Sequence, residues 1–265
     1  MPARKEPRRG GGELVNAAAR AFAVLERLSE KRSAGLEELS RECGLAKPTV
    51  YRFLLTLQDL GYARRCPDDR WTMTLRLFRV GSRALDHLDL YDAARPVAAE
   101  LAERLGETIH MGVREEDSAV YVLKIESRYT IRMHSRVGRR VPLYCTSIGK
   151  CLLAFGEASE TEAYLRGAKL VAFTPHTITD RPGLAAELAL VRKRGYAQDR
   201  EEHEEGVRCI GAPVYDQDGL VVAALSASWP IFRYDPTAEE GHARAVVDAA
   251  LRVSSLLGYE PAAQS

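Results

Sequence analysis

Apolar residues recur at helical spacing in the first 60 residues of the chain and form one-sided stripes over 14–29, 36–43 and 47–60. Gly44 separates the second and third stripes, and glycine turns through positive φ without a steric penalty. Pro48 stands near the start of the third stripe, where its missing N–H is not needed. The pattern predicts three short helices, of which the last two are joined by a tight turn.

The third predicted helix is polar on the side opposite its apolar stripe. The stripe consists of Val50, Phe53, Leu54 and Leu57. The polar side presents residues that can contact phosphates or base edges: Lys47, Thr49, Tyr51, Arg52 and Thr56. Two helices with this turn and this polar face are typical of a helix-turn-helix, with an ordinary helical hairpin in a protein core as the alternative.

A basic hairpin follows Gly61 and favours the DNA-binding alternative. Strand-like segments 62–65 and 70–74 flank the turn 66–69. Arg64, Arg65 and Arg70 are predicted phosphate contacts, which add affinity without sequence choice. Residues 1–76 hold 15 Lys and Arg against 10 Asp and Glu, although the whole chain has a net charge of only +1. The sequence predicts a winged helix-turn-helix over 13–76, preceded by a disordered basic arm over 1–12.

Helical patterns continue over 75–90 and 93–105. The first is apolar on more sides than a lone surface helix needs, so we expect a linker helix over 77–92 that also contacts a second copy. The second is expected to begin around Pro96 and to end at Gly106. From Glu107 onward the pattern alternates as in strands, which are expected over 108–113, 119–125, 130–135, 207–214 and 220–228.

Helices are expected between these strands. Gly149–Phe155 has Ser147 near its N-cap, and Arg181–Arg194 has Pro182 near its start and Gly195 after its end. A shorter helix is expected over 159–165, and a last one to about 258 after a capping box of Thr237 and Glu240. The predicted fold class is α+β, with helices covering a largely antiparallel sheet over 93–260.

Composition limits the kind of protein. The 265 residues are 46% hydrophobic and 28% charged, which is normal for globular proteins and long enough for two domains. The five cysteines form no C-x-x-C pair, so a reducing compartment is favoured over a disulfide framework. Residues 1–12 have no apolar core of a secretory signal, and no stretch approaches the ~20 apolar residues of a membrane span. We expect a cytoplasmic protein without a membrane contact.

The segment CTSIGKCLL, residues 145–153, is the first candidate for chemistry. A Walker phosphate loop is excluded because its first glycine would fall at Tyr144. The amides of Ser147 and Ile148 at a helix start can instead hold a carboxylate, with a simple capped helix as the alternative.

Two further segments carry polar groups near predicted strands. Asp199, His203 and Cys209 suggest a Cys–His–Asp nucleophilic set, or a metal site with His110 and Glu202, although neither has a specific spacing and a solvated loop is simpler. Ser226 and Ser228 lie on one face of an otherwise apolar strand. Two hydroxyls there need a partner, a ligand or solvent.

Taken together, these motifs resemble the IclR family of bacterial transcriptional regulators over nearly the full length. The resemblance rests on GLAKPTVYRFLLTLQDLGY, RVGRRVPLYCTSIGK, EEHEEGVRCIGAPVYDQDG and LSASWP. It implies a GAF/PAS-like effector domain joined to the winged domain by a helix. It also implies dimers or tetramers on a palindromic operator in double-stranded DNA, a small organic acid as effector, and neither a metal nor a cofactor.

The resemblance also implies an effector site, with Val207 and Leu143 as apolar walls. In family members that bind 2-oxo acids, the matching positions are Ser147, Ile148, Asp199, Cys209, Ser226 and Ser228. Within the family the texture is most similar to the pectin-degradation repressors, which respond to 2-keto-3-deoxygluconate. The resulting hypothesis is a repressor of sugar-acid catabolism. The alternatives are a regulator with an aromatic acid, glyoxylate or pyruvate as effector, a Cys/His-dependent enzyme or metal-binding protein, and a DNA-binding protein without an effector.

Overall fold

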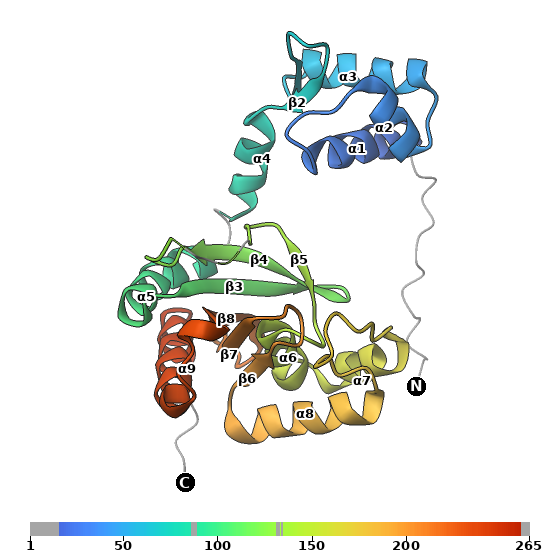
Figure 1. Ribbon diagram of the computed structural model, residues 1–265. Coiled ribbons are helices and arrows are strands. Elements are labelled where there is room, and N and C mark those ends of the chain that lie inside the picture. The colour runs from blue at the N-terminus through green and yellow to red at the C-terminus, as the bar shows by residue number, and fades with distance from the viewer. Residues whose placement is uncertain (1–15, 86–88, 131–132, 134, 261–265) are drawn as a thin grey trace, which may run out of the picture. The chain divides into compact units, whose positions relative to one another are not determined.

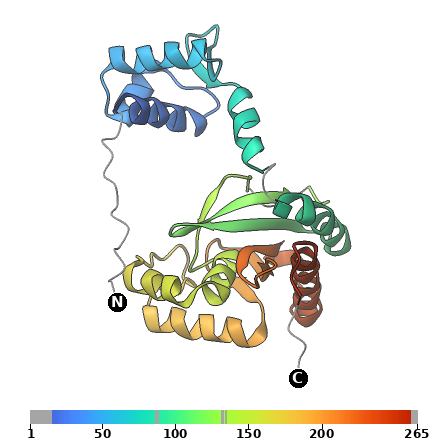
Figure 2. The same ribbon diagram turned by 180° about the vertical axis from the view of Figure 1, so that it is seen from behind.

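The computed structural model describes residues 16–85, 89–130, 133 and 135–260, so the predicted basic arm lies outside the described residues. The chain divides into two compact units, Met1–Leu85 and Asp86–Ser265 (Figures 1 and 2). Each unit is considered by itself.

The first unit is a winged helix-turn-helix, as predicted. Its helices are α1 (Asn16–Ser29), α2 (Leu36–Cys43) and α3 (Lys47–Asp59), followed by an antiparallel ribbon of β1 (Ala63–Arg65) and β2 (Trp71–Met73) and by α4 (Arg76–Leu85). Gly44 ends α2 at φ 63°, which a side chain would disfavour. Leu28, Leu39, Val50, Leu54 and Trp71 are fully buried between the three helices and the ribbon.

The second unit is built on a six-stranded antiparallel sheet. Its strands in spatial order are β5-β4-β3-β8-β7-β6. Their bounds are β3 Thr108–Glu115, β4 Ser118–Ile125, β5 Arg140–Pro142, β6 Ala197–Arg200, β7 Val207–Tyr215 and β8 Val221–Pro230. The long central strands β3, β7 and β8 pair with one another along most of their length. The sheet is therefore rigid in its middle, where two of the predicted site segments lie.

Helices cover both faces of this sheet. The helices α5 (Asp89–Leu105) and α9 (Glu239–Leu256) pack together on one face, and α6 (Ser147–Phe155) packs on the other (Figures 1 and 2). Outside α6 lie α7 (Ala158–Gly167) and α8 (Arg181–Arg194), and two short 3-10 turns, Ile231–Arg233 and Pro236–Ala238, precede α9. The start of α6 is thus held between the sheet and an outer helical layer.

Several local predictions were wrong. The helix expected to begin around Pro96 begins at Asp89, with Pro96 inside it. The pattern over 75–90 corresponds to α4 and the start of α5, and residues 86–88 are not described. No strand forms among the described residues of 130–135, whereas β5 and β6 were not predicted.

Two predicted caps were also wrong. Thr146, not Ser147, is the N-cap of α6, because its side-chain oxygen accepts from the Gly149 N–H at 3.1 Å. No Thr237–Glu240 capping box forms, because Asp235 accepts from both the amide and the hydroxyl of Thr237 and caps the preceding 3-10 turn instead. Both errors arise where two neighbouring residues have side chains that can cap a helix.

Candidate functional site

The start of α6 lies directly on the sheet, at two glycines. A Cβ on Gly211 of β7 would lie 3.1 Å from the carbonyl carbon and oxygen of Ser147, and a Cβ on Gly112 of β3 would lie 2.9 Å from Ile148 Cγ2. On the other side, a Cβ on Gly149 would lie 2.3 Å from the Leu143 backbone. The three glycines therefore fix where the first amides of α6 stand above the strands.

These amides precede the hydrogen-bonded part of the helix. Lys150 donates the first helical bond, to the Thr146 carbonyl at 2.9 Å, and the amides of Ser147 and Ile148 come before it. The amides at a helix start carry a partial positive charge and favour an anion. The geometry thus provides a carboxylate site that needs no cationic side chain.

One small cavity brings together all the predicted effector residues. Its lining includes Ser147, Ile148, Asp199, Cys209, Ser226 and Ser228. The apolar wall predicted at Val207 also lines it. The space inside is about 30 Å³, the volume of about one water molecule in the liquid. A six-carbon acid would therefore enter only with an outward shift of the lining side chains.

Strand register explains why residues from distant segments meet. Asp199 of β6 stands opposite Cys209 of β7, which stands opposite Ser228 of β8. In the neighbouring row, Gly211 faces Ser226, and Ser226 faces His110 of β3. The sequence analysis considered His110 only as a metal ligand. Five further lining residues were missed, Tyr121, Met133, Ser135, Arg139 and Glu204. Their own strand or loop pattern contains no signal of a pocket.

Asp199 has an unusual charge state for an exposed-looking acidic segment. Its carboxylate accepts from the Glu202 N–H at 2.8 Å and is 4% exposed. Burial, followed by the negative charge of Glu202, raises the pKa of Asp199 to about 7. Near neutral pH this carboxyl group can hold a proton and face an anionic ligand without full charge repulsion.

A buried ion pair ties α6 to the segment that carries Asp199. The Lys150 ammonium, which is fully buried, lies 2.5 Å from Glu202 Oε1 and 3.5 Å from Glu187 Oε1. Arg194 completes the group with a 2.8 Å contact to Glu187. Since Lys150 follows the proposed carboxylate site by two residues, a shift of the helix start is transmitted to this charge group.

The chemistry of the cavity does not fit the catalytic or metal alternatives. Burial raises the pKa of the Cys209 thiol and lowers the pKa of His203, so neither forms the thiolate–imidazolium pair of a cysteine nucleophile. Among the described residues, no three His, Cys, Asp or Glu side chains gather as a metal site.

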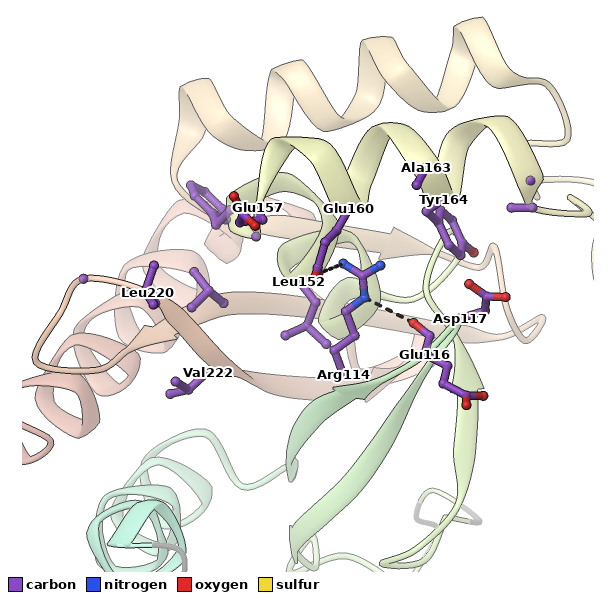
Figure 3. Close-up of a pocket in the computed structure, with 16 residues that line it drawn as sticks. Arg114, Glu116, Asp117, Leu152, Glu157, Glu160, Ala163, Tyr164, Leu220 and Val222 are labelled. Atoms are coloured by element: carbon purple, nitrogen blue, oxygen red, sulfur yellow. Dashed lines mark hydrogen bonds and ion pairs between the residues drawn. The ribbon is translucent and has the colours of Figure 1, made fainter. Parts of the chain in front are cut away.

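A larger groove of about 890 Å³ opens on the outer side of the sheet, between α7 and the β3–β4 hairpin (Figure 3). Arg114 spans it, donating to Glu160 at 3.0 Å and to the Glu116 carbonyl at 3.2 Å (Figure 3). Its charges are thus paired at the surface. The small cavity, with its buried polar groups around a helix start, is the better ligand site.

The predicted DNA contacts differ in their surroundings. Lys47, Arg52, Thr56, Arg64 and Arg65 are exposed. Thr49 is half-buried, and the ring of Tyr51 packs edge-on against Trp71 at 6.3 Å between centroids. Arg70 donates to the Ser33 hydroxyl and carbonyl and pairs with Glu38 at 3.2 Å, so it also holds the hairpin to α2. Arg52 and Arg64 are the most accessible cations of the set.

The chain matches the family model of the IclR helix-turn-helix domain over residues 17–67 and that of the bacterial transcriptional regulator IclR C-terminal domain over residues 82–255. The chain belongs to the IclR family of transcriptional regulators. It is 42% identical over 246 residues to the HTH-type transcriptional regulator KdgR of Escherichia coli strain K12, covering 92% of this chain and 94% of that protein.

Solved structures agree with this assignment. The Thermotoga maritima IclR structure has a TM-score of 0.79 at 32% identity and covers 92% of this chain and 99% of that one. An IclR homologue from Microbacterium hydrocarbonoxydans, solved with 4-hydroxybenzoate, has a TM-score of 0.80 at 25% identity and covers 91% of this chain and 98% of that one.

Membership of the IclR family decides between the classes of function considered above. Its models and relatives are DNA-binding transcriptional regulators, so the alternative of a Cys/His-dependent enzyme was wrong. Within the part of the chain that the structure describes, no helix is long and apolar enough to cross a membrane.

Proposed function

We propose that this IclR-family regulator represses genes of sugar-acid catabolism and is released from its operator by a small 2-oxo acid such as 2-keto-3-deoxygluconate. The observation that carries the proposal is the meeting of Ser147, Ile148, Asp199, Cys209, Ser226 and Ser228 around one cavity at a helix start. The helix amides would bind the carboxylate, and Asp199, Cys209 and the two serines would contact the oxo group and the chain.

Similarity to relatives supports the same conclusion. KdgR of E. coli is similar over 92% of this chain, and its counterpart in the pectin-degradation group responds to the acid proposed here. The M. hydrocarbonoxydans homologue was solved with 4-hydroxybenzoate, which is also a small organic acid. An aromatic acid is therefore the second candidate effector.

In the DNA-binding unit we propose that α3 enters the major groove, as in other helix-turn-helix proteins. Thr49, Tyr51 and Arg52 would reach bases. Lys47, Thr56, Arg64, Arg65 and Arg70 would bind the backbone. The working domains would be 13–76 for DNA, 77–92 for the linker and 93–260 for the effector, in a protein that acts in the cytoplasm.

A second copy is part of the proposal, because a palindromic operator presents two half-sites. Leu75, Phe78 and Val80, at and along α4, are 79%, 72% and 52% exposed. Large apolar side chains in such a row favour a dimer contact over a surface left in water. Dimers or tetramers would then couple effector binding to the spacing of two α3 helices.

Calorimetry tests the effector. 2-Keto-3-deoxygluconate, pyruvate and 4-hydroxybenzoate would be titrated into protein that has been shown to bind DNA upstream of its own gene. The proposal expects heat of binding from the sugar acid with the highest affinity. Tighter binding of 4-hydroxybenzoate would favour the second candidate, and no heat from any of the three acids would refute an organic-acid effector of this class.

A further inference from the structure

A chain of neutral polar groups runs along one side of the cavity. His110 Nε2 lies 2.6 Å from the Ser135 hydroxyl, and His110 Nδ1 lies 3.4 Å from the Ser228 hydroxyl. The imidazole is 2% exposed and stacks on Tyr121 at 4.6 Å between ring centroids. None of these contacts belongs to the carboxylate site at α6, so they require an explanation of their own.

The imidazole in this chain is uncharged. Burial, together with the positive charges of Lys124 and Arg139, lowers the pKa of His110 to about 3. A neutral imidazole has one nitrogen that donates and one that accepts. A hydroxyl group also donates and accepts, so hydroxyl–imidazole–hydroxyl is complementary to further hydroxyls and not to a second anion.

The position of His110 sets the length of a ligand that could use it. From Gly211, under the first amide of α6, register leads to Ser226 and then to His110. Two strand spacings are roughly 10 Å. A six-carbon chain spans roughly 6 Å between its end carbons and bridges this gap with a hydrogen bond at each end. A three-carbon acid held at α6 does not reach the imidazole.

The contact between His110 and Ser228 is also weaker than the contact with Ser135. At 3.4 Å it exceeds the usual length of a strong hydrogen bond. A ligand hydroxyl that bonded both groups would therefore gain more than it displaced. An apolar chain in the same place would leave buried polar groups without partners, which costs about 1–3 kcal/mol for each group.

We infer that His110, with Ser135 and Ser228 on its two sides, is the hydroxyl-binding end of the effector pocket and selects acids that carry hydroxyl groups on a chain of about six carbons. The inference rests on the proposed function and deepens it, because it names the ligand feature that excludes short or apolar 2-oxo acids. Sites built to bond a hydroxyl discriminate strongly against analogues that lack it.

Two acids of equal chain length separate this inference from general 2-oxo acid binding. 2-Keto-3-deoxygluconate and 2-oxohexanoate share the carboxylate, the oxo group and six carbons, and only the first has hydroxyls. Calorimetry on the full-length protein is expected to give at least a tenfold preference for the hydroxylated acid. A wild-type preference below threefold would overturn the inference, whereas no binding of either acid would instead overturn the proposed function.

The variant His110→Phe retains the ring that stacks on Tyr121 and removes both nitrogens. We expect it to reduce the preference to less than threefold, mainly through weaker binding of 2-keto-3-deoxygluconate. His176→Phe, at an exposed loop position, is the matched control and should retain the wild-type preference. A folded His110→Phe protein that retains at least a tenfold preference would overturn the inference.

A second variant keeps the test decisive if the phenylalanine prevents folding. Ser135→Ala removes one partner of the imidazole with little change in volume. It should lower the preference at least threefold, and an unchanged preference would count against the hydroxyl-binding role. Thermal unfolding of each variant establishes that the measured differences come from folded protein.

Discussion

Gly211→Ala tests whether the first turn of α6 is the carboxylate site, because it shifts that turn without altering any polar group. The added Cβ would lie 3.1 Å from the carbonyl carbon and oxygen of Ser147 and 3.2 Å from its Cβ. Non-bonded carbons prefer about 3.5–4.0 Å, so the start of the helix must move away from β7 by roughly 0.5 Å. Overpacking of this kind costs about 1–3 kcal/mol of stability.

Ligand affinity should fall further than stability alone requires. Displacing binding groups by roughly 0.5 Å reaches the limit of productive geometry, so we expect at least a tenfold weaker Kd for the effector, or about 1.4 kcal/mol. DNA affinity without effector should be unchanged, since Gly211 belongs to the other compact unit. The variant would then hold its operator and fail to release it.

The assay combines urea unfolding, calorimetry with the effector and fluorescence anisotropy with operator DNA. Gly241→Ala is the matched control, because nothing lies within 4 Å of the added Cβ and the residue is in α9. It should bind effector normally and gain up to about 1 kcal/mol of helix stability. A folded Gly211→Ala protein with wild-type effector affinity would refute the placement of the carboxylate at α6.

Three further predictions concern charged groups. Lys150→Met should cost about 3–5 kcal/mol in urea unfolding, because it leaves Glu202 buried without its cation, and adding Glu202→Gln should restore more than half of the loss; equal stability of the single and double variants would contradict this account. The native pKa of Asp199, raised from 3.8 to about 7, means that the folded protein binds this proton more tightly, so its stabilising effect is lost as pH rises from about 4 to about 7. Relative to wild type, Asp199→Asn should therefore be more stable at pH 8 than at pH 5, and a pH-independent difference in unfolding free energy would show that Asp199 has an ordinary pKa. Arg52→Ala should abolish operator footprinting while sedimentation shows an unchanged oligomer, whereas an intact footprint would mean that α3 does not read the operator.

Local signals in the sequence located the helices and most of the pocket. Proline at the start and glycine at the end set the bounds of α8 correctly, because both act through their own backbone conformation. The three-residue strand β5 was not predictable in this way. Arg140–Pro142 has little pattern of its own and becomes a strand only by pairing with Ser118–Val120.

The pocket shows the same division. Ser226 and Ser228 were identified because two hydroxyls on an apolar strand need a partner. His110 was not assigned to the pocket, because a lone histidine in a strand has many possible roles and its place beside Ser226 follows from the register of β3 and β8. The charge group of Lys150, Glu202 and Glu187 depends on three elements meeting, and no one of them indicates it alone.

The central claim is that a bound acid changes the affinity of this IclR-family protein for DNA. Fluorescence anisotropy with a labelled fragment from upstream of its own gene measures that coupling directly, at fixed salt, with and without saturating 2-keto-3-deoxygluconate. We predict at least a tenfold weaker Kd for DNA when the acid is bound, within the usual range of allosteric coupling of about 1–3 kcal/mol. An unchanged Kd for DNA, under conditions where calorimetry shows the acid bound, would contradict the account.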